Sequence, residues 1–175
     1  MVRGIILTLT MAALLAPSGV AGASNGKQRV VVERFVDEFS FVAVDCSELG
    51  PYAFSVEVEG TVHVTVTDVF DRDDGSLLQT VIHVVLKETN TNSVSGKSLP
   101  LKQAVHEVWD YASNTRTLTG AAFIGTTPGG GTYVQDTGRI TITLDTRVAQ
   151  FVAGPHEAFF AGGIDAVVCA ELAEG

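Results

Sequence analysis

The chain has 175 residues, with 11 Lys and Arg against 20 Asp and Glu, and a formal net charge of −9. Hydrophobic residues make up 46% of it and charged residues 18%, a composition too apolar for a disordered protein. The 18 Gly and five Pro follow no repeat, which excludes a collagen-like fibre. The acidic balance argues against nucleic acid as a partner, because binding phosphates requires a basic face.

The first 23 residues have the three-part pattern of a secretory signal peptide. Arg3 supplies a basic start, and an apolar run follows over Gly4–Leu15. Small residues at Ala21–Ala23 predict cleavage before Ser24, so residues 1–23 are expected to be a leader and the mature protein to be secreted. The apolar run is shorter than the roughly 20 residues of a membrane span, and we expect no membrane span anywhere in the chain.

The remaining residues, 24–175, have the length of one domain. They contain two cysteines, Cys46 and Cys169, and no CxxC pair. An even number of cysteines in an exported chain predicts a disulfide bond between them rather than a metal or redox site.

Apolar and polar residues alternate with a period of two through most of the chain, which predicts β-strands. The pattern is clearest over Ala53–Phe70, where the even positions from Phe54 to Val66 are apolar, apart from Gly60, and the odd positions are polar. Such a strand has one buried and one wet face. A straight strand of this length would exceed a small domain, so we expect a bend or bulge at Gly60.

Turn residues separate this strand from others on both sides. Arg29–Val44 is predicted as one bent strand or two short ones, and the turn Asp71–Gly75 leads into a hairpin partner over Leu77–Glu88. Further strands are predicted over Ser98–Ala112, Thr115–Ile124, Thr132–Leu144 and Arg147–Ala153.

The tail has a different periodicity. Over Ala161–Ala173, the apolar residues Ile164, Val167, Val168 and Leu172 follow the i, i+3, i+4, i+8 spacing of a helix with one apolar stripe. The sequence therefore predicts an all-β antiparallel meander of seven or eight strands, closed into a barrel and followed by a C-terminal helix. A β-sandwich is the alternative architecture.

Two histidines are candidates for a metal site. If Phe70 pairs with Ser76 across the turn, His63 and His83 are direct cross-strand neighbours, close enough for two imidazoles to bind a metal. The sequence offers no third ligand, and two surface histidines without a role are the simpler interpretation.

The segment from His106 to Tyr111 holds the only tryptophan and several groups that could act as acids or bases. On a strand, Trp109 and Tyr111 share one face, and His106 and Asp110 lie on the other. Trp109 and Tyr111 are candidates for ligand binding, although aromatic residues more often fill a core. His106, Glu107 and Asp110 are candidate catalytic residues, as is His156 in the segment after the last strand.

Other motifs fail their tests, and we expect no cofactor. The acidic turn that begins at Asp71 lacks the Gly and Glu of a calcium-binding EF-hand loop at the required positions. The glycine-rich segment Thr126–Gly131 lacks the GK[ST] ending of a phosphate-binding loop.

The order of these features resembles a set of uncharacterised small secreted bacterial β-barrel proteins. The shared features are the leader and the segments Cys46, Phe70–Asp73, Ser95–Ser98, Asp136–Ile140, Ala153–His156 and Cys169. The resemblance covers most of the mature chain and implies a small barrel, with no activity or functional residues. The architecture is similar to that of lipocalins and allene-oxide-cyclase-like barrels, and a fold does not fix a function.

These patterns leave three hypotheses open. A barrel of about eight strands can hold one small apolar or amphipathic molecule, and this is the leading one. The second is an extracellular interaction or structural domain without a pocket. The third is a cofactor-free isomerase or cyclase that uses the candidate histidines and carboxylates. The pattern does not decide the oligomeric state.

Overall fold

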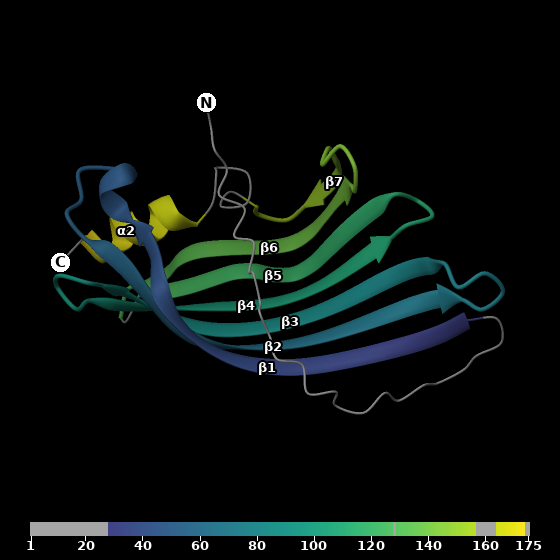
Figure 1. Cartoon of the computed structure of the whole chain (residues 1–175). Coiled ribbons are helices and arrows are strands. Elements are labelled where there is room, and N and C mark those ends of the chain that lie inside the picture. The colour runs from purple at the N-terminus through teal and green to yellow at the C-terminus, as the bar shows by residue number, and fades with distance from the viewer. Residues whose placement is uncertain (1–27, 128, 157–163, 174–175) are drawn as a thin grey trace.

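The computed structural model of the chain describes residues 28–127, 129–156 and 164–173. Seven strands follow one another, with one turn of 3-10 helix after the first and an α-helix at the end (Figure 1). The elements are β1 (Gln28–Asp45), η1 (Cys46–Glu48), β2 (Ser55–Asp71), β3 (Leu77–Asn92), β4 (Ser98–Asp110), β5 (Thr115–Thr127), β6 (Gly131–Thr143), β7 (Ala149–Ala153) and α2 (Asp165–Ala173).

The strands form one antiparallel sheet in which each pairs with the next along the chain. This confirms the predicted all-β meander with a C-terminal helix. The sheet curves strongly but stays open among the described residues, because β1 and β7 are its two edges and do not pair with each other. Closure into a barrel brings the first and last strands side by side, and here β7 has only five residues against 18 in β1.

Alternate residues of each strand face opposite sides of the sheet. In β2, Val56, Val58 and Val62 are buried and face the side on which α2 lies, whereas Glu57 and Glu59 are exposed. We call the side toward α2 the inner face and the opposite side the outer face. Figure 1 shows α2 and η1 lying over one end of the inner, concave face.

Glycines let neighbouring backbones approach where the sheet bends. Gly120 and Gly138 have φ of 116° and 134°, and a Cβ atom at either would collide with the carbonyl oxygen of Ala104 or Ala153 on the next strand. Gly60 is not a bulge, because the ladders on both sides of β2 run through it without a shift. A side chain at Gly60 would instead meet the Phe39 ring and the Lys87 carbonyl.

The best-packed core lies between α2 and the sheet. Val168 and Leu172 of the helix pack with Val56, Val58 and Leu99 of the sheet, all at most 4% exposed. This confirms the predicted apolar stripe, although residues 161–163, at the predicted helix start, lie outside the described residues. Burial of these side chains is what holds the helix against the strands.

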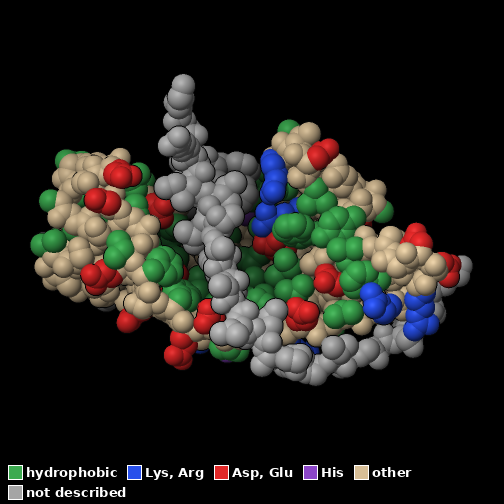
Figure 2. All heavy atoms as spheres, in the orientation of Figure 1, with side chains coloured by type: hydrophobic (Ala, Val, Ile, Leu, Met, Phe, Trp, Pro, Cys, Tyr) green, Lys and Arg blue, Asp and Glu red, His purple; other side chains and the backbone are tan. Residues whose placement is uncertain are grey.

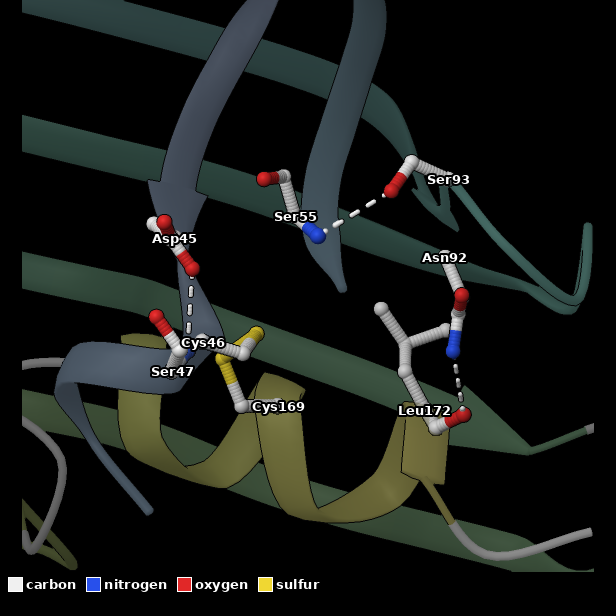
Figure 3. The surroundings of a disulfide bond; sticks show 8 residues. All are labelled: Asp45, Cys46, Ser47, Ser55, Asn92, Ser93, Cys169 and Leu172. Atoms are coloured by element: carbon white, nitrogen blue, oxygen red, sulfur yellow. Dashed lines mark hydrogen bonds between the residues drawn. A yellow bond between two sulfur atoms is a disulfide. The ribbon is translucent and has the colours of Figure 1, made fainter. Parts of the chain in front are cut away.

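The predicted disulfide bond is present. Cys46, at the start of η1, is bonded to Cys169 on α2 across a sequence separation of 123 residues, and both are fully buried (Figure 3). Near the bond, the Asn92 side chain donates a hydrogen bond to the carbonyl oxygen of Leu172 at 3.3 Å. The helix is therefore fixed by a covalent bond to η1, directly after β1, and by a hydrogen bond from β3.

The predicted leader, residues 1–23, lies outside the described residues. Within the described ranges, no helix is long and apolar enough to cross a membrane.

Candidate functional site

An apolar strip runs across the part of the inner face that lies beyond α2. The register places Val64 of β2 opposite Val84 of β3, and Val84 opposite Val105 of β4. The next inner row brings further apolar side chains from β2 to β6. We call this set the inner strip, and it consists of Phe35, Val64, Val66, Ile82, Val84, Val105, Leu118 and Ile140. In Figure 2, hydrophobic side chains gather over the right-hand part of the sheet, away from α2.

A group of hydrogen-bonded polar residues on β4 and β5 borders the inner strip, and one of them, Glu107, lies within its second row, between Ile82 and Leu118. Trp109 Nε1 donates to Glu107 Oε2 at 2.8 Å. Arg116 donates to both oxygens of the same carboxylate, from Nε at 2.9 Å and from Nη2 at 2.8 Å, in the two-pronged geometry that suits a guanidinium. The guanidinium also lies 5.3 Å from the centre of the Trp109 ring. All three side chains are only partly buried.

A second hydrogen-bonded group adjoins the first. Thr80 lies between Asp68 and Trp109 in the inner row that crosses β2, β3 and β4. Its hydroxyl donates to Asp68 Oδ1 at 2.6 Å and lies 3.3 Å from the Tyr111 hydroxyl. We call the combined set the polar end, and it consists of Asp68, Thr80, Glu107, Trp109, Tyr111 and Arg116.

The polar end contains both predicted ligand-binding residues. Of the predicted catalytic residues it contains only Glu107. Trp109 and Tyr111 lie beside Glu107 on the inner face, as their alternation predicts. His106 is exposed on the outer face, opposite His83 and Thr119. Asp110 accepts a hydrogen bond from the Ser113 backbone at 2.9 Å in the following turn. His106, Glu107 and Asp110 therefore do not form one catalytic group.

Sequence reasoning missed Arg116, Asp68 and Thr80. Each comes from a different strand, so only the register between strands reveals that they meet Trp109. One signal was available in the sequence. Arg116 is a single charged residue between Thr115 and Thr117, in the alternating segment after the β4–β5 turn. The residues of a site built across strands are not close together in the sequence.

The predicted pairing of His63 with His83 is wrong. The hairpin closes through a hydrogen bond from Asp71 N to Ser76 O at 2.8 Å, and an irregularity between Val69 and Phe70 shifts the register. His63 consequently pairs with Val85, and His83 pairs with His106. Among the described residues, no cluster of three or more His, Cys, Asp or Glu side chains could hold a metal ion.

His156 does not stand alone at the end of the sheet. Its Nδ1 atom lies 2.7 Å from Asp136 Oδ1, and its Nε2 atom lies 3.0 Å from the Ala153 carbonyl oxygen. Both ring nitrogens are therefore within hydrogen-bonding distance of a protein oxygen. The ring is 7% exposed. This geometry suits a structural ion pair that fastens the segment after β7 to β6.

Two further ionisable groups lie close to α2. Burial raises the pKa of the Glu88 carboxyl group; a hydrogen bond from Asn90 opposes this shift, and the negative charge of Asp165 adds to it. Burial raises the pKa of Tyr133 to about 12, with smaller contributions from the charges of Glu88 and Glu171. The Tyr133 hydroxyl is buried and has no hydrogen-bond partner among the described residues. Negative charge is therefore disfavoured in this region.

A shallow groove crosses β1 to β4 at a different place. Its rim carries Glu38 and Glu59 with Lys87 and Lys102, all of them exposed. Glu88 also lines the groove, so three acidic side chains there face two basic ones, and the four on the rim are open to solvent. The inner strip and its polar end are the better candidate site, because they combine apolar side chains, all partly buried except the buried Val105 and Ile140, with fixed hydrogen-bonding groups.

No protein-family model, curated protein or solved structure matches the chain. The functional argument therefore rests on the site itself.

Proposed function

We propose that the inner face binds one small amphipathic molecule. Its apolar body lies along the inner strip and its head lies beside Trp109 and Arg116 at the polar end. The observation that carries this proposal is the continuity between the two sets: Ile82 of the strip lies opposite Glu107 of the polar end, and Glu107 lies opposite Leu118. An apolar surface with a few fixed polar groups at one end is typical of ligand sites.

The electrostatics of the polar end favour an uncharged head group. Glu107 and Arg116 cancel each other in a bidentate ion pair at 2.8 Å, so neither presents a free charge to a ligand. Hydroxyl groups of a ligand can exchange hydrogen bonds with Tyr111 and Thr80. A carboxylate head would bring a second negative charge close to Glu107 and Asp68, and we expect it to bind more weakly.

The site supports binding better than catalysis. His106 and Asp110 lie away from the polar end, and both ring nitrogens of His156 face acceptors. The isomerase or cyclase hypothesis therefore loses His106, Asp110 and His156 from this site and keeps only Glu107, which is held in an ion pair with Arg116. Binding also does not require that the sheet close into a barrel, because the curved sheet offers its apolar surface from one side.

We also propose that the protein works outside the cytoplasm. The predicted leader supplies the route. The buried Cys46–Cys169 disulfide is compatible with an oxidising compartment.

Trp109 is the only tryptophan in the chain, so its fluorescence reports on the site alone. We expect a saturable change in emission on titration with glycerol monododecanoate, and a weaker affinity for dodecanoate at pH 8. Val84→Thr places a hydroxyl group in the strip and should weaken binding several-fold. Val85→Thr, the neighbouring position on the outer face, is the matched control and should leave the affinity unchanged.

Isothermal titration calorimetry on the unmodified protein and on the Val84 and Val85 variants keeps the measurement independent of the fluorophore. Two results would overturn the proposal. One is the absence of saturable binding of either amphiphile to the unmodified protein, and the other is an equal loss of affinity in the Val84 and Val85 variants.

A further inference from the structure

The edge of the sheet formed by β1 is long and unpaired. Within the described residues, β1 pairs with β2 on one side and with no strand on the other. It has 18 residues, which is long for an edge strand. A free edge of this kind presents a row of backbone donors and acceptors that can pair with another strand.

The hydrogen-bond pattern identifies which residues of β1 direct their backbone groups outward. Ser55 of β2 accepts a hydrogen bond from Ser93, on the β3 side, and Phe54 accepts one from Cys46, on the β1 side. Alternation along β2 therefore directs its even residues toward β1, where Val58 to Val66 pair with odd residues from Phe41 to Glu33. The even residues of β1 from Val30 to Ser40 consequently direct N–H and C=O groups toward the free edge.

The side chains of these even residues lie on the outer face. When a second copy of the strand runs antiparallel to the first, most apolar residues can face apolar residues and Arg34 can face Glu38. In order they are Val30, Val32, Arg34, Val36, Glu38, Ser40 and Val42. Val36 stands at the centre and is 61% exposed, and Val42 at one end is 63% exposed. Arg34 and Glu38, equally spaced on either side of Val36, are also exposed and opposite in charge.

We propose that two copies of this chain pair through β1, antiparallel and centred on Val36, to form one continuous sheet. In this register Arg34 lies opposite the partner's Glu38, and the same pair recurs on the other side of the two-fold axis. Val36 lies opposite its own counterpart, and Val30 lies opposite the partner's Val42. Such an interface is self-complementary, as a two-fold symmetric dimer requires.

Charge selects this register over its neighbours. Centring the pair on Glu33, Arg34, Asp37 or Glu38 places each of these residues opposite its own copy. Centring it on Phe35 places Glu33 opposite the partner's Asp37. Like charges directly opposite each other are destabilising in a sheet, whereas opposite charges stabilise it. Among the centres from residue 33 to residue 38, only Val36 avoids every like-charge pair and forms two favourable ones.

The outward backbone groups can make the bonds that such a pairing needs. The five even residues from Val32 to Ser40 each exchange two hydrogen bonds with a partner residue, so about ten backbone bonds join the two sheets. The ladder ends near Val42, where β1 has an irregularity before Val44. The other free edge, β7, has only five residues and offers far fewer groups.

Charge reversal with rescue tests this interface specifically. The protein expressed from the whole sequence should sediment as a dimer at micromolar concentration in analytical ultracentrifugation. Arg34→Glu places like charges opposite each other twice and should raise the dimer dissociation constant at least tenfold, as should Glu38→Arg. The double variant with both changes restores opposite charges at both positions and should recover the dimer.

Val36→Pro provides an independent test, because it removes an outward N–H and leaves the β1–β2 ladder intact. It should yield monomers whose disulfide bond and Trp109 fluorescence match those of the unmodified protein. In the dimer, hydrogen exchange should protect the Val36 amide, and this protection should disappear in Arg34→Glu. A monomeric unmodified protein, or a dimer that both single reversals leave intact, would overturn the proposal.

Discussion

The imidazole of His156 and the carboxylate of Asp136 lie 2.7 Å apart, with side-chain exposures of 5% and 0%. The pair links the segment that follows β7 to the middle of β6. A backbone hydrogen bond from Thr137 N to Pro155 O at 2.9 Å runs beside it. A buried charge is tolerated in a protein when a charged partner and hydrogen bonds compensate for its lost hydration.

Replacing His156 with Gln should destabilise the protein strongly. The change breaks the contact of the buried Asp136 carboxyl group with the imidazole ring, and breaking a buried pair of this kind typically costs about 3–5 kcal/mol. Urea unfolding followed by circular dichroism at pH 7 measures this difference in the free energy of unfolding. The double variant Asp136→Asn, His156→Gln removes both charges and should lose less than the single variant. A loss below about 1 kcal/mol in His156→Gln would show that the pair is not ionic.

Removing the disulfide bond should free α2 from the sheet. The bond closes a loop of 123 residues, and chain entropy for such a loop corresponds to about 4–5 kcal/mol of stabilisation, although measured values are often smaller. We therefore expect Cys46→Ser, Cys169→Ser to lower the free energy of unfolding by up to that amount in urea titrations. Hydrogen exchange should accelerate in α2 more than in β3 and β4. Unchanged exchange in α2 would show that packing of Val168 and Leu172 alone holds the helix.

The alternation of side chains was sufficient to predict the strands and their inner and outer faces. Alternation along a strand predicts Trp109 and Tyr111 on one face of the sheet and His106 on the other. Alternation did not predict the register between strands. The irregularity between Val69 and Phe70 shifts the β2–β3 pairing, so His83 does not lie opposite His63.

The polar end could not be predicted either, because it also depends on the register between strands. Arg116 contacts Glu107 only through the pairing of β4 with β5. The alternation of apolar and polar residues also could not predict whether the sheet closes into a barrel. β7 has only five residues, and in the described structure it does not pair with β1. Periodicity does not report such pairing.

Glu88 should make the stability of the protein depend on pH in a definite direction. Burial raises the pKa of its carboxyl group above the ordinary value of 4.5, so the folded chain binds more protons than the unfolded chain between the two values. The free energy of unfolding therefore falls as the pH rises through that window. Glu88→Gln removes this contribution and should be more stable than the unmodified protein at pH 7, because the amide does not lose the hydration of a charge on burial.

The comparison is best made as a difference between the two proteins at pH 4 and pH 7, measured by urea unfolding. Other carboxylates such as Asp45 and Asp74, whose pKa values are lowered by hydrogen bonds from the Ser47 and Ser76 residues, affect both proteins equally and cancel. A stability advantage of Glu88→Gln that is the same at both pH values would contradict the assignment.

Gly138→Ala should disrupt the close approach of β6 to the end of β7. The residue has a φ of 134°, which is unfavourable for alanine, and a Cβ atom would collide with the Ala153 carbonyl oxygen. Because this obstruction is backbone rather than a flexible side chain, we expect a loss of more than about 2 kcal/mol in urea unfolding. Gly75→Ala is the control: its φ is 75° and a Cβ atom there has open space around it, so only the conformational cost of about 1 kcal/mol remains. Equal losses in the two variants would show that backbone conformation, and not the close approach of the two segments, makes Gly138 necessary.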